Sequence, residues 1–106
     1  MAMTGIATIN QQDFERAVLQ AKGPVLVDFY ADWCGPCQAM TPVLEQFAGH
    51  NAEAVEVVKV NVDNDGELAA SYGVRSIPTL VLFRDGEAVS TQVGAQSLSA
   101  LTALIQ

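Results

Sequence analysis

The chain's only two cysteines, Cys34 and Cys37, lie where a predicted strand passes into a predicted helix. The run 25–30 before them is apolar, as in a buried strand, and apolar residues recur at helical spacing after them. In a first helical turn, residues with this spacing have Cα atoms roughly 5 Å apart, which is within the range that a disulfide needs. The pair can therefore close and open with little movement of the backbone, and the pattern predicts a redox site.

The position of Cys34 just before the first helical turn makes it the candidate reactive thiol. Unpaired N–H groups and the positive end of the helix dipole favour a thiolate over a thiol at this cap. Gly35 lets a partner backbone approach closely, and Pro36 is tolerated because its missing N–H would have no partner so early in a helix. We expect Cys34 to be exposed and Cys37 to be shielded.

Two other interpretations of the cysteine pair stay open on these residues alone. One is half of a structural zinc site, although tetrahedral zinc takes four ligands and the chain's only histidine is His50. The other is a pair of inert, buried thiols. Trp33 is either a core aromatic or, as its place before the turn suggests, a surface ring that shields the sulfurs.

Asp28 and Lys59 are charged residues inside apolar runs. Burial of Asp28 within the run 25–30 is expected to raise the pKa of its carboxyl group. Such an acid near a dithiol can move a proton to and from the second cysteine, and the alternative is a strand-end aspartate that faces water. Lys59 is the nearest candidate counter-charge, unless its stem passes the strand edge so that the ammonium reaches water.

Charge and hydropathy narrow the class of partner. Twelve acidic and five basic side chains give a net charge of −7, which argues against nucleic acid or an anionic membrane surface. No apolar run approaches the length of a membrane span, and residues 1–6 do not resemble a secretory signal. A lone close-spaced cysteine pair without a signal fits a reducing compartment, although a trimmed exported protein would look the same. We expect one cytoplasmic, monomeric domain spanning 1–106, long enough to bury a core.

Periodicity along the chain predicts the element order β-α-β-α-β-α-β-β-α. Parallel units come first and a hairpin at Asp85-Gly86 ends the sheet, so we expect a central mixed sheet with helices on both faces. The helices are expected to begin after the cap residue Asn10, at Cys34, at Glu67 and at Leu98. The expected strands span 6–9, 25–30, 55–62, 79–83 and 87–91.

Four blocks of this sequence resemble the thioredoxin family in order and spacing, and the resemblance covers essentially the whole chain. The blocks are 25–37, 60–63, 72–80 and 93–95. Gly-Pro between the cysteines distinguishes the chain from glutaredoxin, disulfide-isomerase and DsbA types. The resemblance implies the thioredoxin fold and a protein-disulfide reductase that carries electrons by dithiol–disulfide exchange without a bound cofactor. It also implies that a thioredoxin reductase, drawing on NADPH, restores the dithiol.

Residue roles follow from the same resemblance, position by position. It implies that Cys34 attacks, that Cys37 resolves, and that Asp28 is the buried acid–base residue with Lys59 as its neighbour. It also implies a cis peptide bond before Pro78, where the rarity of cis bonds would otherwise favour trans. A surface that docks disulfide-bearing protein substrates is implied at Trp33, Gly35, Pro36, Ile77, Pro78, Gly94 and Ala95.

The chain departs from the common family pattern at three positions near the cysteines. Tyr30 stands where many members have tryptophan, Ser76 where many have glycine, and Gln38 where many have lysine. The missing lysine should weaken thiolate stabilisation slightly. Two other functions stay open: a disulfide oxidase or isomerase, against which the Gly-Pro dipeptide and the missing signal argue, and a non-enzymatic interaction subunit that uses the apolar docking surface.

Overall fold

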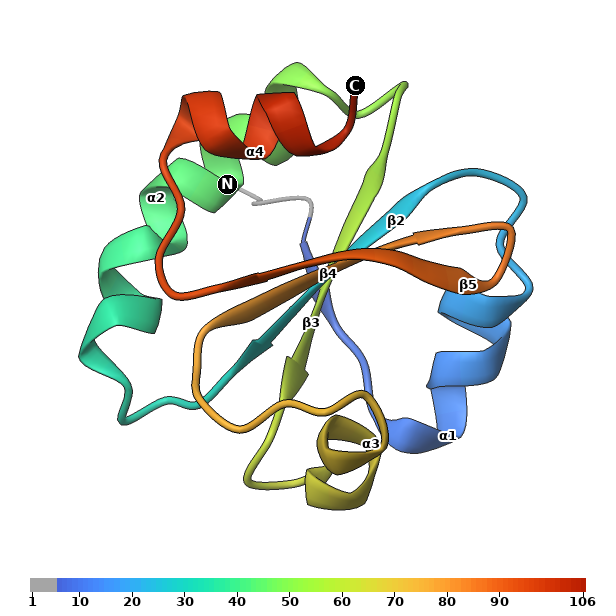
Figure 1. Cartoon of the computed structure of the whole chain (residues 1–106), viewed down its shortest axis with the longest axis vertical. Coiled ribbons are helices and arrows are strands. Elements are labelled where there is room, and N and C mark those ends of the chain that lie inside the picture. Colours follow the sequence, from blue (N-terminus) through green and yellow to red (C-terminus); the bar gives the residue numbers. More distant parts are fainter. Residues whose placement is uncertain (1–5) are drawn as a thin grey trace.

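A five-stranded sheet with the order β1-β3-β2-β4-β5 forms the centre of the molecule in the computed structural model, which describes residues 6–106 (Figure 1). β1, β3 and β2 run parallel, whereas β4 is antiparallel to β2 and β5 is antiparallel to β4. The predicted mixed sheet is therefore confirmed. The strands are β1 (Ala7–Thr8), β2 (Val25–Tyr30), β3 (Glu56–Asn61), β4 (Thr79–Arg84) and β5 (Glu87–Val93).

Helices cover both faces of this sheet, as predicted (Figure 1). One face packs against α1 (Gln11–Phe14) and α3 (Gly66–Ser71) through a core that includes Phe14 and Ala69. The other face packs against α2 (Gly35–His50) and α4 (Leu98–Leu104) through a core that includes Phe47 and Leu101. Among the described residues, no helix is long and apolar enough to cross a membrane.

The first helix differs from the prediction in its second half. Asn10 caps it as expected, because its side chain accepts a hydrogen bond from the Asp13 N–H at 3.0 Å. Beyond α1 the chain continues as a π-helix, η1 (Glu15–Leu19), in which the Gln20 N–H donates to the Glu15 carbonyl at 2.8 Å. Apolar spacing over so few residues does not distinguish a π-helical turn from an α-helical one.

The hairpin between β4 and β5 turns at Asp85-Gly86, as predicted. Both residues have positive φ, 53° and 81°, which is the conformation that an Asp-Gly hairpin turn adopts. At Gly86 a Cβ atom would also lie only 2.6 Å from the Leu19 carbonyl oxygen. Glycine is thus required here both by the turn and by the close approach of η1.

Alternation along β2 places the candidate acid beneath the helix that carries the cysteines. Val27 and Phe29 face the core shared with α1 and α3, whereas Leu26 faces the core shared with α2 and α4. Because side chains alternate between the two faces of a strand, Asp28 and Tyr30 lie on the α2 side with Leu26.

Residues 1–5, which contain most of the segment expected to lack a secretory signal, lie outside the described residues.

Candidate active site

Cys34 and Cys37 form a disulfide at the start of α2, and their Cα atoms are 5.2 Å apart. Cys34 is the N-cap of this helix, and its Sγ accepts a hydrogen bond from the Cys37 N–H at 3.1 Å. Pro36 lies in the first turn, where it removes no helical hydrogen bond. The predicted spacing and the predicted cap are therefore both confirmed.

The expectation that Cys34 is exposed is wrong in this disulfide form. Only 3% of Cys34 and 5% of Cys37 is exposed, and the two pack together with Ala31. In this form the Cys34 sulfur lies 3.8 Å from the Ile77 carbonyl oxygen. What distinguishes the two cysteines here is the helix cap, which stabilises negative charge on Cys34.

Trp33 lies on the surface beside the disulfide, with 70% of its area exposed. Its indole Nε1–H donates a hydrogen bond to Asp63 Oδ2 at 2.8 Å, which fixes the ring across the loop that follows β3. The interpretation as a surface ring is confirmed, and the core alternative is wrong. No local pattern in the sequence predicts this role for Asp63, because its partner is distant along the chain.

Asp28 is buried, with 2% of its area exposed, as the apolar run predicts. Within 6–106, its Oδ1 atom has no hydrogen-bond partner. Loss of hydration raises the pKa of this carboxyl from 3.8 to about 6, and the positive charge of Lys59 opposes the rise. The alternative of a solvated aspartate is therefore wrong.

Lys59 lies beside Asp28 and is its counter-charge, as predicted. Its Cα is the register partner of Asp28 across β2 and β3. The ammonium Nζ lies 4.1 Å from the centroid of the Tyr30 ring, and the described part of the chain contains no Lys59–Asp28 ion pair. Lys59 is thus a counter-charge that acts through space while its ammonium rests on an aromatic face.

The Ile77–Pro78 peptide bond is cis, as the resemblance implies. The Pro78 carbonyl accepts a hydrogen bond from the Gly94 N–H at 2.8 Å, which joins two of the segments expected to dock substrates. Gly35, Pro36 and Ala95 are exposed. Pro78 itself is buried, so it supports this surface from beneath, and a docking role for the set remains a prediction.

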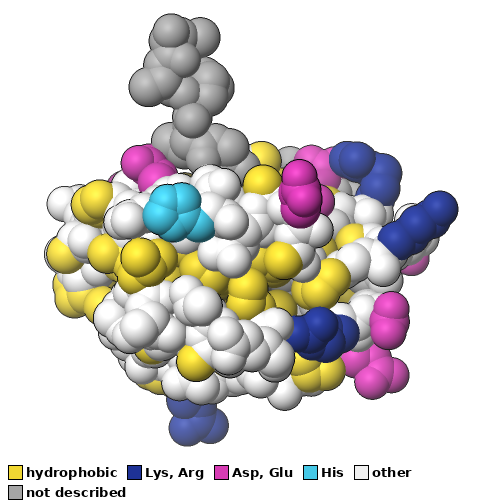
Figure 2. All heavy atoms as spheres, turned by 90° about the horizontal axis from the view of Figure 1, so that it is seen from above, with side chains coloured by type: hydrophobic (Ala, Val, Ile, Leu, Met, Phe, Trp, Pro, Cys, Tyr) yellow, Lys and Arg dark blue, Asp and Glu magenta, His cyan; other side chains and the backbone are white. Residues whose placement is uncertain are grey.

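No group of three or more His, Cys, Asp or Glu side chains that could hold a metal ion occurs in residues 6–106. His50 is the last residue of α2, whereas the cysteines are at its start, so a helical rise of about 1.5 Å per residue separates them by roughly 20 Å. It cannot complete a zinc site with them. Figure 2 shows the exposed histidine on a face where acidic and basic side chains are interspersed.

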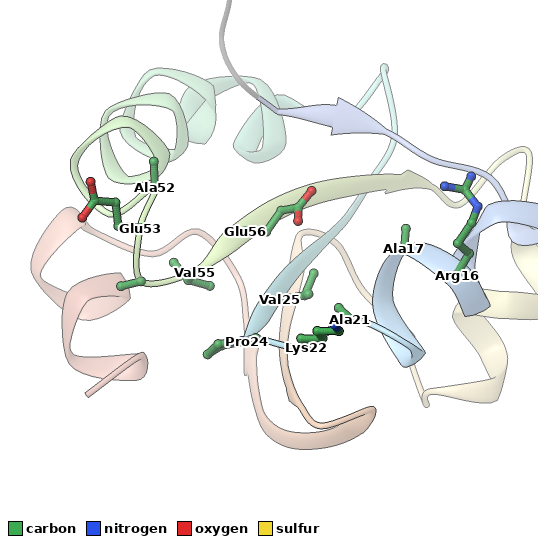
Figure 3. Close-up of a pocket in the computed structure, with 12 residues that line it drawn as sticks. Arg16, Ala17, Ala21, Lys22, Pro24, Val25, Ala52, Glu53, Val55 and Glu56 are labelled. Carbon is green, nitrogen blue, oxygen red and sulfur yellow. The ribbon is translucent and has the colours of Figure 1, made fainter.

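A large groove lies at the opposite end of β2 from the disulfide and contains none of the candidate site residues. Its volume is about 510 Å³, and it lies between η1 and the start of β3. Figure 3 shows Arg16 at one end, Glu53 at the other and Glu56 between them.

Comparisons with known proteins agree over nearly the whole chain. A family model described as Thioredoxin matches residues 5–106. Thioredoxin 1 of Synechococcus elongatus is 47% identical over 93 residues, covering 88% of this chain and 87% of the relative. Thioredoxin of Pseudomonas aeruginosa is 46% identical over 100 residues, covering 94% and 93%, and thioredoxin of Haemophilus influenzae is 48% identical over 93 residues, covering 88% and 87%.

Proposed function

The chain belongs to the thioredoxin family, and we propose that it reduces protein disulfides as an electron carrier in which Cys34 attacks and Cys37 resolves. Thioredoxins are protein-disulfide oxidoreductases, and this chain holds its two cysteines at disulfide distance, as dithiol–disulfide exchange requires. The observation that carries the assignment of roles is the helix cap. The Cys34 sulfur accepts the Cys37 N–H and lies at the positive end of α2, which favours a thiolate there.

The first step consumes a substrate disulfide. In the dithiol form, the Cys34 thiolate attacks one sulfur of that disulfide, the substrate S–S bond breaks, and the released sulfur leaves as a thiolate that takes up a proton. A mixed disulfide then joins Cys34 to the substrate. The exposed rim of Trp33, Gly35, Pro36 and Ala95 supports docking of a protein substrate around this sulfur.

The second step releases the substrate. Cys37 gives its proton to Asp28, and its thiolate attacks the Cys34 sulfur of the mixed disulfide. The Cys34–Cys37 bond forms, and the second substrate sulfur leaves as a thiolate and is protonated. Two electrons have passed from the protein to the substrate without a bound cofactor. Asp28 suits the acceptor role because it lies beneath α2 and burial brings its pKa to about 6.

The remaining parts of the proposal concern the partner and the compartment. We place the chain in the cytoplasm as a monomeric, single domain, with thioredoxin reductase and NADPH as the source of electrons. Family membership and the Gly-Pro dipeptide between the cysteines support this choice over an oxidase. Turnover of a protein disulfide with purified thioredoxin reductase and NADPH tests it, and a measured reduction potential near that of periplasmic oxidants would contradict it.

The assignment of the two thiols is tested by trapping. Cys37→Ser should accumulate a mixed disulfide with a protein substrate, because the resolving thiol is missing. Cys34→Ser, the matched control, should accumulate none. Equal trapping by both variants would contradict the assignment, and unchanged substrate binding by the protein lacking both thiols would favour an interaction subunit instead.

A further inference from the structure

Three side chains beneath α2 form a connected group whose arrangement is not explained by the exchange reaction alone. Asp28 and Tyr30 lie two residues apart on β2, so they point to the same face of the sheet. Lys59 is the register partner of Asp28 on β3. Its ammonium nevertheless lies over the Tyr30 ring, 4.1 Å from the centroid.

The Tyr30 ring also contacts the active-site cluster. It is half-buried and packs against the cluster formed by Ala31, Cys34 and Cys37. A fixed aromatic face attracts a cation through its quadrupole, most strongly where water is partly excluded. The ring therefore offers the Lys59 ammonium a definite aromatic face, and the same ring packs against the active-site cysteines.

Asp28 would be expected to attract the same ammonium. It is buried, and its Oδ1 atom has no hydrogen-bond partner within 6–106. An unpaired buried carboxylate gains much from a direct ion pair with a neighbouring cation. No such ion pair joins these two described residues, whereas the Lys59 ammonium does contact the Tyr30 ring.

We propose that Tyr30 is a positioning residue for the resolving step, because its ring holds the Lys59 ammonium away from direct pairing with Asp28. The carboxyl then feels the charge of Lys59 only through space and keeps enough proton affinity to accept the Cys37 proton near neutral pH. This role rests on the proposed function of Asp28.

Side chains from three neighbouring elements also face this site. From α2, Glu45 is half-buried and lines a cavity of about 120 Å³ together with Lys59, and Cys37 is in the disulfide. β1 contributes Thr8 to the same cavity, and β4 places Leu80 opposite Asp28. Glu45 is therefore a second acid, besides Asp28, that lies near Lys59 in the described structure. If Lys59 turned to Glu45 in a variant, the pKa of Asp28 would rise.

The direct test is an NMR titration of the Asp28 side-chain carboxyl carbon in the oxidised protein. Tyr30→Leu removes the ring, so the ammonium should pair with Asp28 and the pKa of Asp28 should fall by about one unit. Tyr30→Phe and Tyr30→Trp keep an aromatic face and should leave that pKa close to its wild-type value. Thermal unfolding of each variant shows whether it remains folded.

A double-mutant comparison distinguishes two effects on the pKa of Asp28: movement of the Lys59 ammonium, and entry of water into the space that a smaller side chain leaves. In a Lys59→Met background, Tyr30→Leu should leave the pKa of Asp28 unchanged, because no cation remains to move. An equal fall in this background means that hydration causes the effect and overturns the proposal. No change in the single variant, or a rise because Lys59 turns to Glu45 or to water, overturns it too.

A measurement on the unmodified protein decides the question even if Tyr30→Leu does not fold. The side-chain protons of Lys59 near its ammonium should be shifted upfield by the Tyr30 ring current. Lys22, the other lysine of the chain, is exposed and provides the control. Equal shifts for the two lysines would overturn the proposal. Because these readouts need no turnover, trapping with Cys37→Ser tests the proposed function separately.

Discussion

Replacing Asp28 by asparagine should stabilise the oxidised protein in a manner that depends on pH. The folded state holds the Asp28 proton more tightly than the unfolded chain does, because burial raises the pKa of this carboxyl from 3.8 to about 6. Below the lower of these two pKa values, the Asp28 carboxyl is protonated in both the folded and the unfolded state, so its burial carries no cost of ionisation. As pH rises between the two values, the unfolded chain ionises first, so the free energy of unfolding of the wild type falls.

The size of this effect follows from the width of the pH window. The shift from 3.8 to about 6 is roughly 2 units, and each unit corresponds to about 1.4 kcal/mol. Wild type and Asp28→Asn should therefore have similar stabilities near pH 3, and the variant should be more stable by about 3 kcal/mol above pH 7. Asparagine does not titrate, so the difference between the two curves isolates this carboxyl.

Urea unfolding of the oxidised protein across this pH range measures the difference directly. Asp32→Asn is the matched control, because Asp32 is an exposed aspartate in the turn before the cysteines and its replacement should change the free energy of unfolding little. A constant difference between wild type and Asp28→Asn at every pH, or one that grows in acid, would show that the reasoning about burial is wrong.

Three further predictions concern the thiols and the hairpin. In the reduced protein, iodoacetamide at neutral pH should label Cys34 well before Cys37, and equal rates in a mass-spectrometric time course would contradict the role of the helix cap. Asp28→Asn should slow release of substrate from the mixed disulfide on the order of tenfold or more at neutral pH, measured by stopped flow, whereas formation of the mixed disulfide should keep its rate. Gly86→Ala should destabilise the fold on the order of 2 kcal/mol, because the turn needs positive φ and a Cβ would collide with a carbonyl of η1. Gly66→Ala, with open space around it, is the control in the same urea assay. Equal losses of stability in the two variants would refute the argument.

Local patterns in the sequence determined most of the fold and the core of the site. Alternation and helical spacing are properties of neighbouring residues, so the runs around Asp28 and after Cys37 predicted a buried strand, a buried acid and a capped helix. The Asp-Gly pair at Asp85 predicted the hairpin because few residue pairs adopt positive φ together. The spacing of the cysteines likewise predicted their Cα separation, which a helical turn fixes.

Tertiary structure alone decided the features that depend on contacts between distant segments. The sequence does not show that the Cys34 sulfur lies 3.8 Å from the Ile77 carbonyl oxygen, so the burial of Cys34 in the disulfide form was not predicted. Nor does it show that Asp63 fixes Trp33, or that Lys59 meets the Tyr30 ring instead of Asp28. A side chain's neighbours along the strand follow from its position, but its partner across the sheet is settled by packing, where burial, charge and an aromatic face compete for the same group.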